Sequence, residues 1–323
     1  MCTAIAYQVK DLYFGRNLDL EYSYQECVTI TPRNYSFSFR KENQLTQHHA
    51  IIGVATIANG YPLYYDAVNE FGLCIAALNF PGNAIYLPEN PQKCNITPFE
   101  FIPWILSQCK SVREAHNMLI NINIVDTPFS AEYPLTPLHW IVSDATESLT
   151  AEPLHDGLHL HFNPVGVLTN NPPFDFHMHN LCNYMNLTAE EAENRFSREL
   201  ELKPFSRGMG GIGLPGDLSS QSRFIRAAFT KFNSVHEETE EKNVSQFFHI
   251  LGSVYQQKGC VKVSDKYEKT VYSSCCNANQ GIYYYKTYYN SQITAVKLSN
   301  EPLDSENLIS YPLLTNPQIQ YAN

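Results

Sequence analysis

The sequence predicts an α+β fold in which antiparallel sheets pack together and helices cover them on the outside. Segments with strand patterns and segments with helix patterns come in blocks, in the order strands, helices, strands, helices, strands. A parallel doubly wound sheet would instead alternate strand and helix. The 323 residues contain no internal repeat and no stretch of linker composition, so we expect one domain over residues 1–323.

The first eighty residues have the pattern of β-strands. Five segments are apolar or alternate apolar with polar residues, and Asn, Gly or Pro separate them. These segments are Thr3–Val9, Leu12–Arg16, Cys27–Thr31, Ala50–Ala58 and Leu73–Phe80. The short interval between the first two favours a hairpin, which would bring Arg16 and Asp19 back close to the start of the chain.

Two helices follow, and each begins with a capping box, in which a Ser or Thr and a Glu three residues later satisfy each other's backbone groups. The boxes are Thr97–Glu100, with a Pro at the first helical position, and Ser111–Glu114. Strands return at Leu138–Ser143, Leu158–Phe162 and Val165–Leu168.

The last third of the chain continues with helices and ends in strands. A third capping box, Thr188–Glu191, predicts a short helix, and Gly208–Gly216 predicts a loop. That loop matches G-x-G-x-x-G but neither follows a strand nor opens a helix, so it does not indicate a dinucleotide site. The remaining predicted elements are helices at Gln221–Phe232 and Val244–Gln257, the latter begun by Asn243, and strands at Lys269–Cys275, Gly281–Tyr288 and Gln292–Leu298.

Composition narrows the possible partners and location. A net charge of −10 argues against nucleic acid or an anionic membrane as partner. No apolar stretch reaches the roughly 20 residues of a membrane span. The first residues lack a basic segment followed by an apolar run, so we expect no secretory leader. Nine scattered cysteines without C-x-x-C favour reduced thiols in a cytoplasm. Histidines pair at His48–His49, His159 and His161, and His177 and His179, but no acidic or Cys residue lies at ligand spacing, so we expect no metal. We expect no cofactor either.

Cys2 is the most informative residue. A small side chain after Met1 usually allows the Met to be removed, which would leave Cys2 as the first residue. Its thiol would then be a nucleophile beside its own α-amine, a base with a pKa of about 8. The predicted hairpin adds Arg16, whose charge would favour the thiolate, and Asp19, which could accept hydrogen bonds from the amine.

Met1–Ala4 and Tyr13–Asp19 closely resemble the choloylglycine hydrolase family of N-terminal nucleophile amidases, and the chain is most similar to the bile salt hydrolase branch. The resemblance implies a four-layer αββα sandwich of two antiparallel sheets. It extends in order along nearly the whole chain, through Thr31–Tyr35, Leu78–Pro81, Leu138–Trp140, Gly166–Pro172, Gly213–Asp217, Ser222–Phe224, Phe247–Leu251 and Tyr272–Cys275.

The resemblance also implies roles for the residues around the thiol. Cys2 matches the nucleophile, and its freed amine matches the proton shuttle. Asp19 matches the carboxylate that holds this amine. Arg16 matches a guanidinium beside the sulfur, and Arg223 matches a second one that lines the site.

Two asparagines match the oxyanion hole of the family. Asn170 would contribute its side-chain amide and Asn79 a further donor, through its backbone. Penicillin V acylases typically carry Tyr at the position of Asn79, so Asn79 favours bile salts. Cys74 and Ala77 stand where relatives usually have glycine, and their side chains could alter rate or substrate range.

By resemblance, the substrates are glycine- or taurine-conjugated bile salts, cleaved through a thioester. A sterol needs an apolar cleft, for which Tyr24, Tyr61, Tyr65 and Phe129 are the candidate wall residues. The family is bacterial and commonly forms homotetramers, so we expect a homo-oligomer. Alternatives are a penicillin V acylase or related N-acyl amidase, including one acting on acylated homoserine lactones, and a non-catalytic bile-acid binder.

Overall fold

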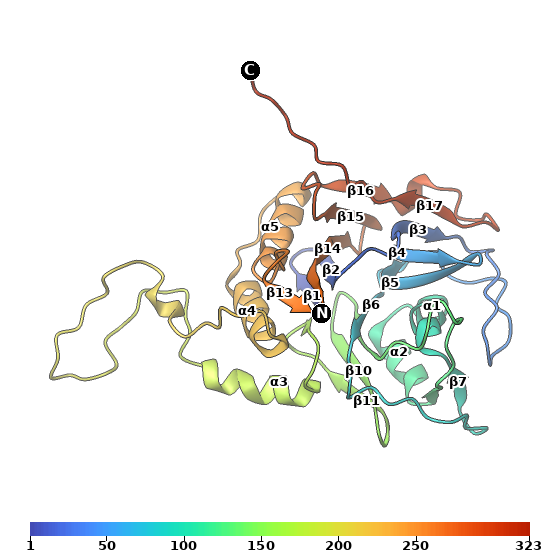
Figure 1. Cartoon of the computed structure of the whole chain (residues 1–323), viewed down its shortest axis with the longest axis horizontal. Coiled ribbons are helices and arrows are strands. Elements are labelled where there is room, and N and C mark those ends of the chain that lie inside the picture. The colour runs from blue at the N-terminus through green and yellow to red at the C-terminus, as the bar shows by residue number, and fades with distance from the viewer.

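The computed structural model describes all residues 1–323 and contains two large sheets packed face to face (Figure 1). Strands of the first sheet follow the order β12-β1-β2-β14-β15-β16, with β13 paired to β14, and all pairs are antiparallel. Its strands are β1 (Cys2–Gln8), β2 (Leu12–Leu20), β12 (Val167–Leu168), β13 (Val261–Val263), β14 (Lys266–Asn277), β15 (Ile282–Thr287) and β16 (Thr294–Lys297).

The second sheet is also antiparallel and has the order β11-β10-β9-β6-β5-β4-β3-β17. Its strands are β3 (Cys27–Thr31), β4 (Ile51–Ala58), β5 (Tyr61–Asn69), β6 (Cys74–Asn79), β9 (Leu138–Ser143), β10 (Ser148–Leu154), β11 (Gly157–Phe162) and β17 (Ile309–Pro312). A separate parallel pair joins β7 (Cys94–Ile96) to β8 (Ile122–Ile124).

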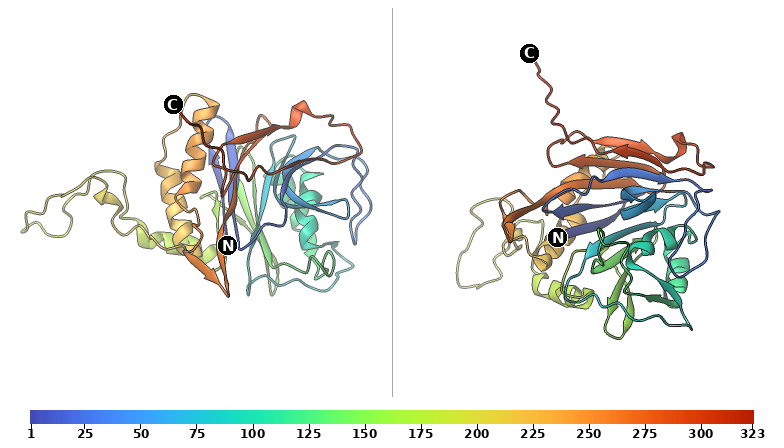
Figure 2. Two further views of the ribbon diagram at one scale, coloured as in Figure 1. Left: turned by 45° about the horizontal axis from the view of Figure 1, so that its top comes forward. Right: turned by 45° about the vertical axis from the view of Figure 1, so that its right-hand side comes forward.

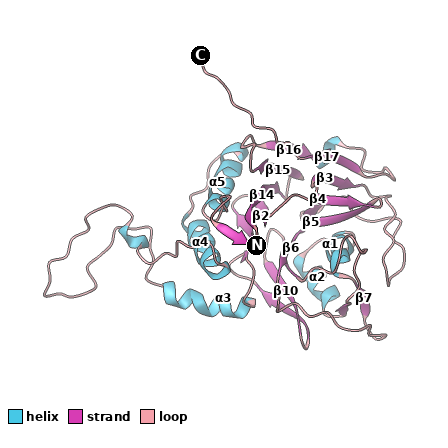
Figure 3. Ribbon diagram, in the orientation of Figure 1, coloured by secondary structure: helices cyan, strands magenta, loops and turns pink.

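Helices cover the outer faces of both sheets, which confirms the predicted αββα layering (Figures 2 and 3). The helices α4 and α5 contact the first sheet, and α1 and α2 contact the second. None of the helices combines the length and apolarity needed to cross a bilayer. The helices are α1 (Phe101–Leu106), α2 (Val112–Leu119), α3 (Phe174–Leu181), α4 (Ser220–Asn233) and α5 (Glu240–Gly252).

The alternation of side chains along each strand divides the core into layers. On β6, Cys74, Ala76 and Leu78 belong to the hydrophobic cluster whose side chains include those that fill the space between the two sheets. Their neighbours Ile75 and Ala77 belong to the cluster between the second sheet and α1 and α2. This strand is buried on both faces, which is why its sequence is continuously apolar.

The hairpin predicted at the chain start is confirmed, and β1 and β2 pair so that Cys2 lies opposite Leu18. Strand β5 is absent from the predicted elements, because Gly60 and Pro62 favour a turn at its start. Asn59 and Gly60 instead form a tight hairpin turn, with positive φ angles of 50° and 78°. The strand begins directly after them.

The short helix predicted at Thr188–Glu191 is wrong. The hydroxyl of Thr188 does bond locally, accepting from the Glu190 amide at 3.1 Å, but its backbone N–H donates to Gly210 and holds the segment in a loop. Helix α3 was missed because Pro173, which precedes it, offers no side-chain cap. Helix α5 begins after Thr239, and not at Asn243 as predicted.

Gly53 on β4 marks a very close approach of β4 and β5. A Cβ atom there would overlap the carbonyl oxygen of Asp66 and the side chain of Ala67. We expect Gly53→Ala to lower the free energy of unfolding by about 1–3 kcal/mol, as measured by urea unfolding. Gly216→Ala is the matched control, because nothing lies within 4 Å of its added methyl group. Equal stabilities of the two variants would contradict the close approach.

Candidate active site

Cys2 begins β1 and is almost completely buried, yet it contributes to the wall of a pocket lined mostly by hydrophobic residues. Its backbone nitrogen donates to Oδ1 of Asn170 at 2.9 Å. This contact joins the start of the chain to a residue 168 positions away. A thiol in the wall of a pocket, with its own nitrogen held by a side chain, suits a nucleophile at the start of the chain.

Arg16 lies one strand away on β2, and its guanidinium reaches across to the second sheet. Its Nη1 donates to the carbonyl of Tyr65 at 2.9 Å and to that of Ala77. The Nε and Nη2 groups are buried without a protein partner. Burial alone would lower the pKa of Arg16. The nearby acidic groups, of which Cys2 contributes most, outweigh burial and raise this pKa above its ordinary value.

Arg223 on α4 connects the chain start to Asn170. Its Nη2 donates to Oδ1 of Asn170 at 2.6 Å, while Nη1 donates to the Thr3 hydroxyl at 2.6 Å and to the Cys2 carbonyl. The residue is fully buried, and this desolvation lowers its pKa, opposed by Asp19 and Cys2. Arg223 therefore orients other groups of the site, since these contacts occupy its guanidinium.

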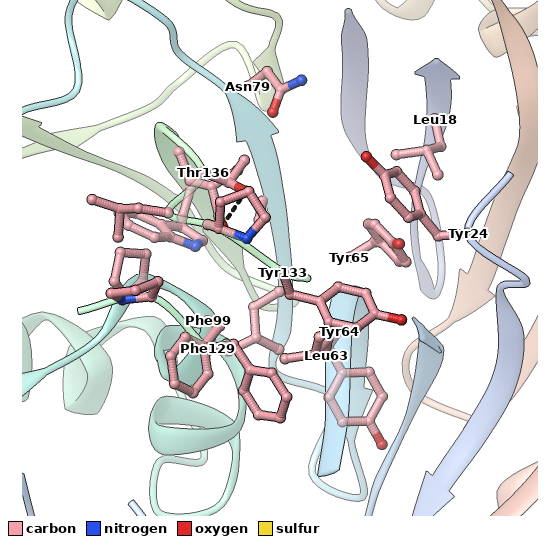
Figure 4. A pocket seen from close by; sticks show the side chains of 18 of the residues that line it. Leu18, Tyr24, Leu63, Tyr64, Tyr65, Asn79, Phe99, Phe129, Tyr133 and Thr136 are labelled. Carbon is pink, nitrogen blue, oxygen red and sulfur yellow. Dashed lines mark hydrogen bonds between the residues drawn. The ribbon is translucent and has the colours of Figure 1, made fainter. Parts of the chain in front are cut away.

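Asn170 and Asn79 meet beside the thiol. Because Oδ1 of Asn170 accepts two hydrogen bonds, its amide nitrogen must point the opposite way, and it donates to the Asn79 carbonyl at 2.7 Å. The second hydrogen of this amide remains available as a donor. Asn79 ends β6, and its side chain stands at one end of the pocket (Figure 4).

Asp19 lies on β2 close to the chain terminus. Its Oδ1 accepts from the Thr270 hydroxyl at 2.6 Å, and its Oδ2 is buried without a partner. Burial raises the pKa of Asp19, opposed by the terminal ammonium and by Arg223. With Met1 in place, the terminal ammonium donates to the Asp19 carbonyl at 2.8 Å and pairs with the buried Glu268. Burial lowers the pKa of that ammonium.

The pocket that Cys2 opens into is mostly hydrophobic and lies between the sheets and the loop of residues 127–136 (Figure 4). Its polar end holds Cys2, Arg16 and Asn79. The remaining walls come chiefly from Leu18, Leu20, Leu63, Phe99, Ile102, Phe129, Tyr133, Leu135, Leu138 and Trp140. Such a cavity suits a large apolar ligand that carries one polar group.

Three of the four candidate wall residues, Tyr24, Tyr65 and Phe129, do line this pocket. Tyr61 does not, and its ring packs behind the wall, 5.7 Å from that of Phe129. Sequence reasoning missed Leu63 because it missed β5, and it missed Tyr133 because the loop has no periodic pattern. The Thr127-Pro128 pair and the further prolines at 134 and 137 were the available signal that an ordered loop lies here.

Cys74 and Ala77, for which the resemblance led us to expect glycine, lie within a regular strand. Strand β6 pairs with β5 and β9, and Ala77 lies opposite Trp140. Ala77 lines the pocket, so its methyl group adds to the wall, while its carbonyl accepts from Arg16. Cys74 is fully buried away from the pocket, and burial raises its pKa well above the ordinary value.

Comparison with known sequences places this arrangement among characterised enzymes. The sequence model of the linear amide C–N hydrolases, choloylglycine hydrolase family, matches residues 2–311. A bile salt hydrolase/transferase of Lactiplantibacillus plantarum is 56% identical, and the alignment covers 100% of both chains. A bile salt hydrolase/transferase of Clostridium perfringens is 38% identical, again over 100% of both chains.

Solved structures agree with the sequence comparison. An arginine-to-leucine variant of the conjugated bile acid hydrolase from Clostridium perfringens superposes with a TM-score of 0.92, at 37% identity and 100% coverage of both chains. A penicillin V acylase from Agrobacterium tumefaciens shares the fold, with a TM-score of 0.76 at 17% identity over 99% of this chain and 94% of that chain. The chain belongs to the choloylglycine hydrolase family and is an amidohydrolase of linear amides.

Proposed function

We propose that this enzyme is a bile salt hydrolase, which cleaves the amide bond of glycine- or taurine-conjugated bile acids. The observation that carries the proposal is the placement of Cys2 at the polar end of an apolar pocket, with Asn170 and Arg16 beside it. The apolar walls suit a sterol. The two buried N–H groups of Arg16 without acceptors are available to a polar group of the substrate. The names of the full-length relatives support this substrate class.

The proposed reaction proceeds through a thioester. The Cys2 thiolate attacks the amide carbonyl, and the carbonyl oxygen becomes an oxyanion that accepts hydrogen bonds from Asn79 and Asn170. One such donor typically lowers the barrier by about 3–4 kcal/mol. The α-amine of Cys2, which has taken the proton of the thiol, passes that proton as an ammonium to the departing nitrogen of glycine or taurine. The same amine then removes a proton from water, which attacks the thioester and releases the bile acid and the free thiol.

This mechanism requires removal of Met1, because the α-amine of Cys2 exists only after that cleavage. The nitrogen of Cys2 already points at Oδ1 of Asn170, and Asp19 nearby holds one buried oxygen without a partner. Both would suit a free ammonium at Cys2. We further propose that residues 1–323 act as one domain, in a bacterial cytoplasm where the nine unpaired cysteines stay reduced.

The substrate assignment is tested by incubating the purified enzyme with glycocholate, taurocholate, penicillin V and an acylated homoserine lactone. The amine released from each substrate is measured, which is homoserine lactone for the last. The intact mass of the enzyme shows whether Met1 is absent. We expect both bile salts to be hydrolysed well above the other two substrates. Preferential hydrolysis of penicillin V would instead assign the enzyme to the acylase alternative, and binding of bile salts without turnover would make it a binder.

Cys2→Ser should reduce turnover of the preferred bile salt by about 10³-fold or more, because a hydroxyl is a far weaker nucleophile than a thiolate. Circular dichroism and the unfolding temperature should stay close to those of the parent enzyme, since the two side chains are nearly isosteric. Substantial remaining activity in this variant would refute the assigned nucleophile.

Asn170→Ala removes the amide that supports the developing oxyanion, and we expect kcat to fall about 10²- to 10³-fold. Asn163→Ala is the matched control, because Asn163 is also buried but donates to Thr150 and Val167 outside the pocket. Both variants should lose stability, whereas only Asn170→Ala should lose kcat by this amount. Similar kcat values for the two variants would remove Asn170 from the oxyanion hole.

We propose that the enzyme forms homo-oligomers, with the tetramer as the expected form. The segment between α3 and α4 extends away from the body of the molecule (Figures 1 and 2). It exposes Met185, Phe196, Phe205 and Ile212, of which the two phenylalanines are 85% and 86% exposed. Apolar side chains gathered on an extended segment favour contact with another copy of the chain.

Light scattering coupled to size exclusion should therefore give a mass of several times 36.8 kDa. The double variant Phe196→Ser and Phe205→Ser should shift this mass toward that of the monomer. Tyr321→Ser, at an exposed position in the C-terminal tail, is the control and should leave the mass unchanged. A monomeric parent enzyme would contradict the proposal.

A further inference from the structure

A single buried imidazole contacts both segments of the oxyanion hole. His139 lies on β9 opposite Leu78, the residue that precedes Asn79. Its ring stacks on Phe80, the residue that follows Asn79, with centroids 4.2 Å apart and an interplanar angle of 4°. Its Nε2 lies 2.9 Å from the carbonyl oxygen of Thr169, the residue that precedes Asn170.

The proton on this imidazole is determined by its partners. A carbonyl oxygen can only accept, so Nε2 of His139 must carry a hydrogen to bond Thr169. The other ring nitrogen lies 3.0 Å from Oε1 of Glu152, and both side chains are completely buried. A proton lies between this nitrogen and the carboxylate, so Nε2 remains a donor whichever of the two groups holds that proton. Glu152 is itself held by the Phe174 amide at 3.1 Å.

The backbone of Asn170 is held at two further points. Its N–H donates to the Ser220 hydroxyl at 2.8 Å, and its carbonyl accepts from Nε2 of His177 at 3.0 Å. With the preceding carbonyl held by His139, both peptide groups that flank the Cα of Asn170 are held. The direction of the Asn170 side chain, and hence its 2.7 Å contact with Asn79, depends on these anchors.

We propose that His139 and Glu152 are positioning residues for amide hydrolysis, which hold the Thr169–Asn170 segment and the Asn79–Phe80 segment in register. Through them, the donors of Asn79 and Asn170 converge on one substrate oxygen. This inference rests on the proposed function, because it assumes an oxyanion at that point. Both side chains are completely buried, and their polar atoms are occupied by each other, by the Thr169 carbonyl and by the Phe174 amide, so neither is expected to contact substrate.

A positioning role and a merely structural role differ in what they change. Loss of a buried polar pair lowers stability in both cases. Only a positioning role lowers kcat of the folded enzyme while leaving KM nearly unchanged, because the oxyanion exists in the transition state and not in bound substrate. Activity must therefore be expressed per folded active site, counted by alkylation with iodoacetamide and mass spectrometry of the peptide that contains Cys2, because the exposed Cys182 and Cys260 also react.

The test compares His139→Leu, Glu152→Leu and Glu152→Gln on the preferred bile salt. We expect the two leucine variants to lose about 10- to 100-fold in kcat, with KM within about threefold of the parent, since the donors are displaced and not removed. Glu152→Gln should stay within about threefold of the parent. Its amide can donate to Nδ1 and accept from Phe174, which keeps the hydrogen on Nε2.

His48→Leu is the matched control. His48 is also buried, and its two ring nitrogens face the carbonyls of His49 and Tyr35, away from Cys2. This variant should lose stability without losing kcat. The inference would be overturned if both leucine variants kept the kcat of the parent enzyme, or if Glu152→Gln and Glu152→Leu lost kcat by the same factor. If His139→Leu does not fold, the two Glu152 variants decide. A parent enzyme that alkylates at Cys2 but releases no amine would instead refute the proposed function.

Discussion

The hydrogen bonds that converge on Oδ1 of Asn170 are the interactions on which the rest of the site depends. The nitrogen of Cys2 and the guanidinium of Arg223 both donate to this one oxygen. Three segments far apart in the sequence thereby meet at one atom: the chain start, the loop after β12 and helix α4. Because this oxygen accepts twice, the amide group cannot flip, and its nitrogen keeps a single direction.

The interior of the sandwich contains several buried charged side chains. Arg16, Arg223, Asp19 and Asp66 are all buried between or beside the sheets. Asp66 accepts from Tyr272 at 2.6 Å, from Ser274 at 3.1 Å and from Tyr283, while burial raises its pKa and Arg16 opposes this effect. Buried charges of this kind cost stability, and the large apolar layers around them supply the compensation.

Much of the fold and most of the site could be predicted from the sequence, and the failures have physical causes. Strong local signals worked, as in the β1–β2 hairpin and the capping box at Ser111, whose hydroxyl accepts from the Glu114 amide at 3.2 Å. The box at Thr188 failed because a backbone contact with Gly210 holds that segment in a loop. Propensity is a weak influence where a tertiary contact competes with it.

The positioning residues His139 and Glu152 could not be predicted from the sequence, for a different reason. Nothing local distinguishes His139 from any other histidine in a strand, since its meaning comes from Glu152, Thr169 and Phe80. The resemblance to a family supplied the residues around the thiol, because those belong to recognisable motifs. His139 lies within one of the matching motifs, Leu138–Trp140, but the resemblance gave it no role and did not include Glu152.

Met1 is half-buried, and the placement of its ammonium has a consequence for how the free α-amine of Cys2 is made. Its ammonium is enclosed by Asp19 and Glu268 once the first sheet has formed. An aminopeptidase acts on an extended, accessible end, so the cleavage has to happen on the nascent chain, before β1 takes its place between β2 and β12. Under the proposed mechanism, synthesis that outpaces this trimming would yield folded molecules without the free α-amine of Cys2, and a preparation's specific activity would then report its biosynthetic history.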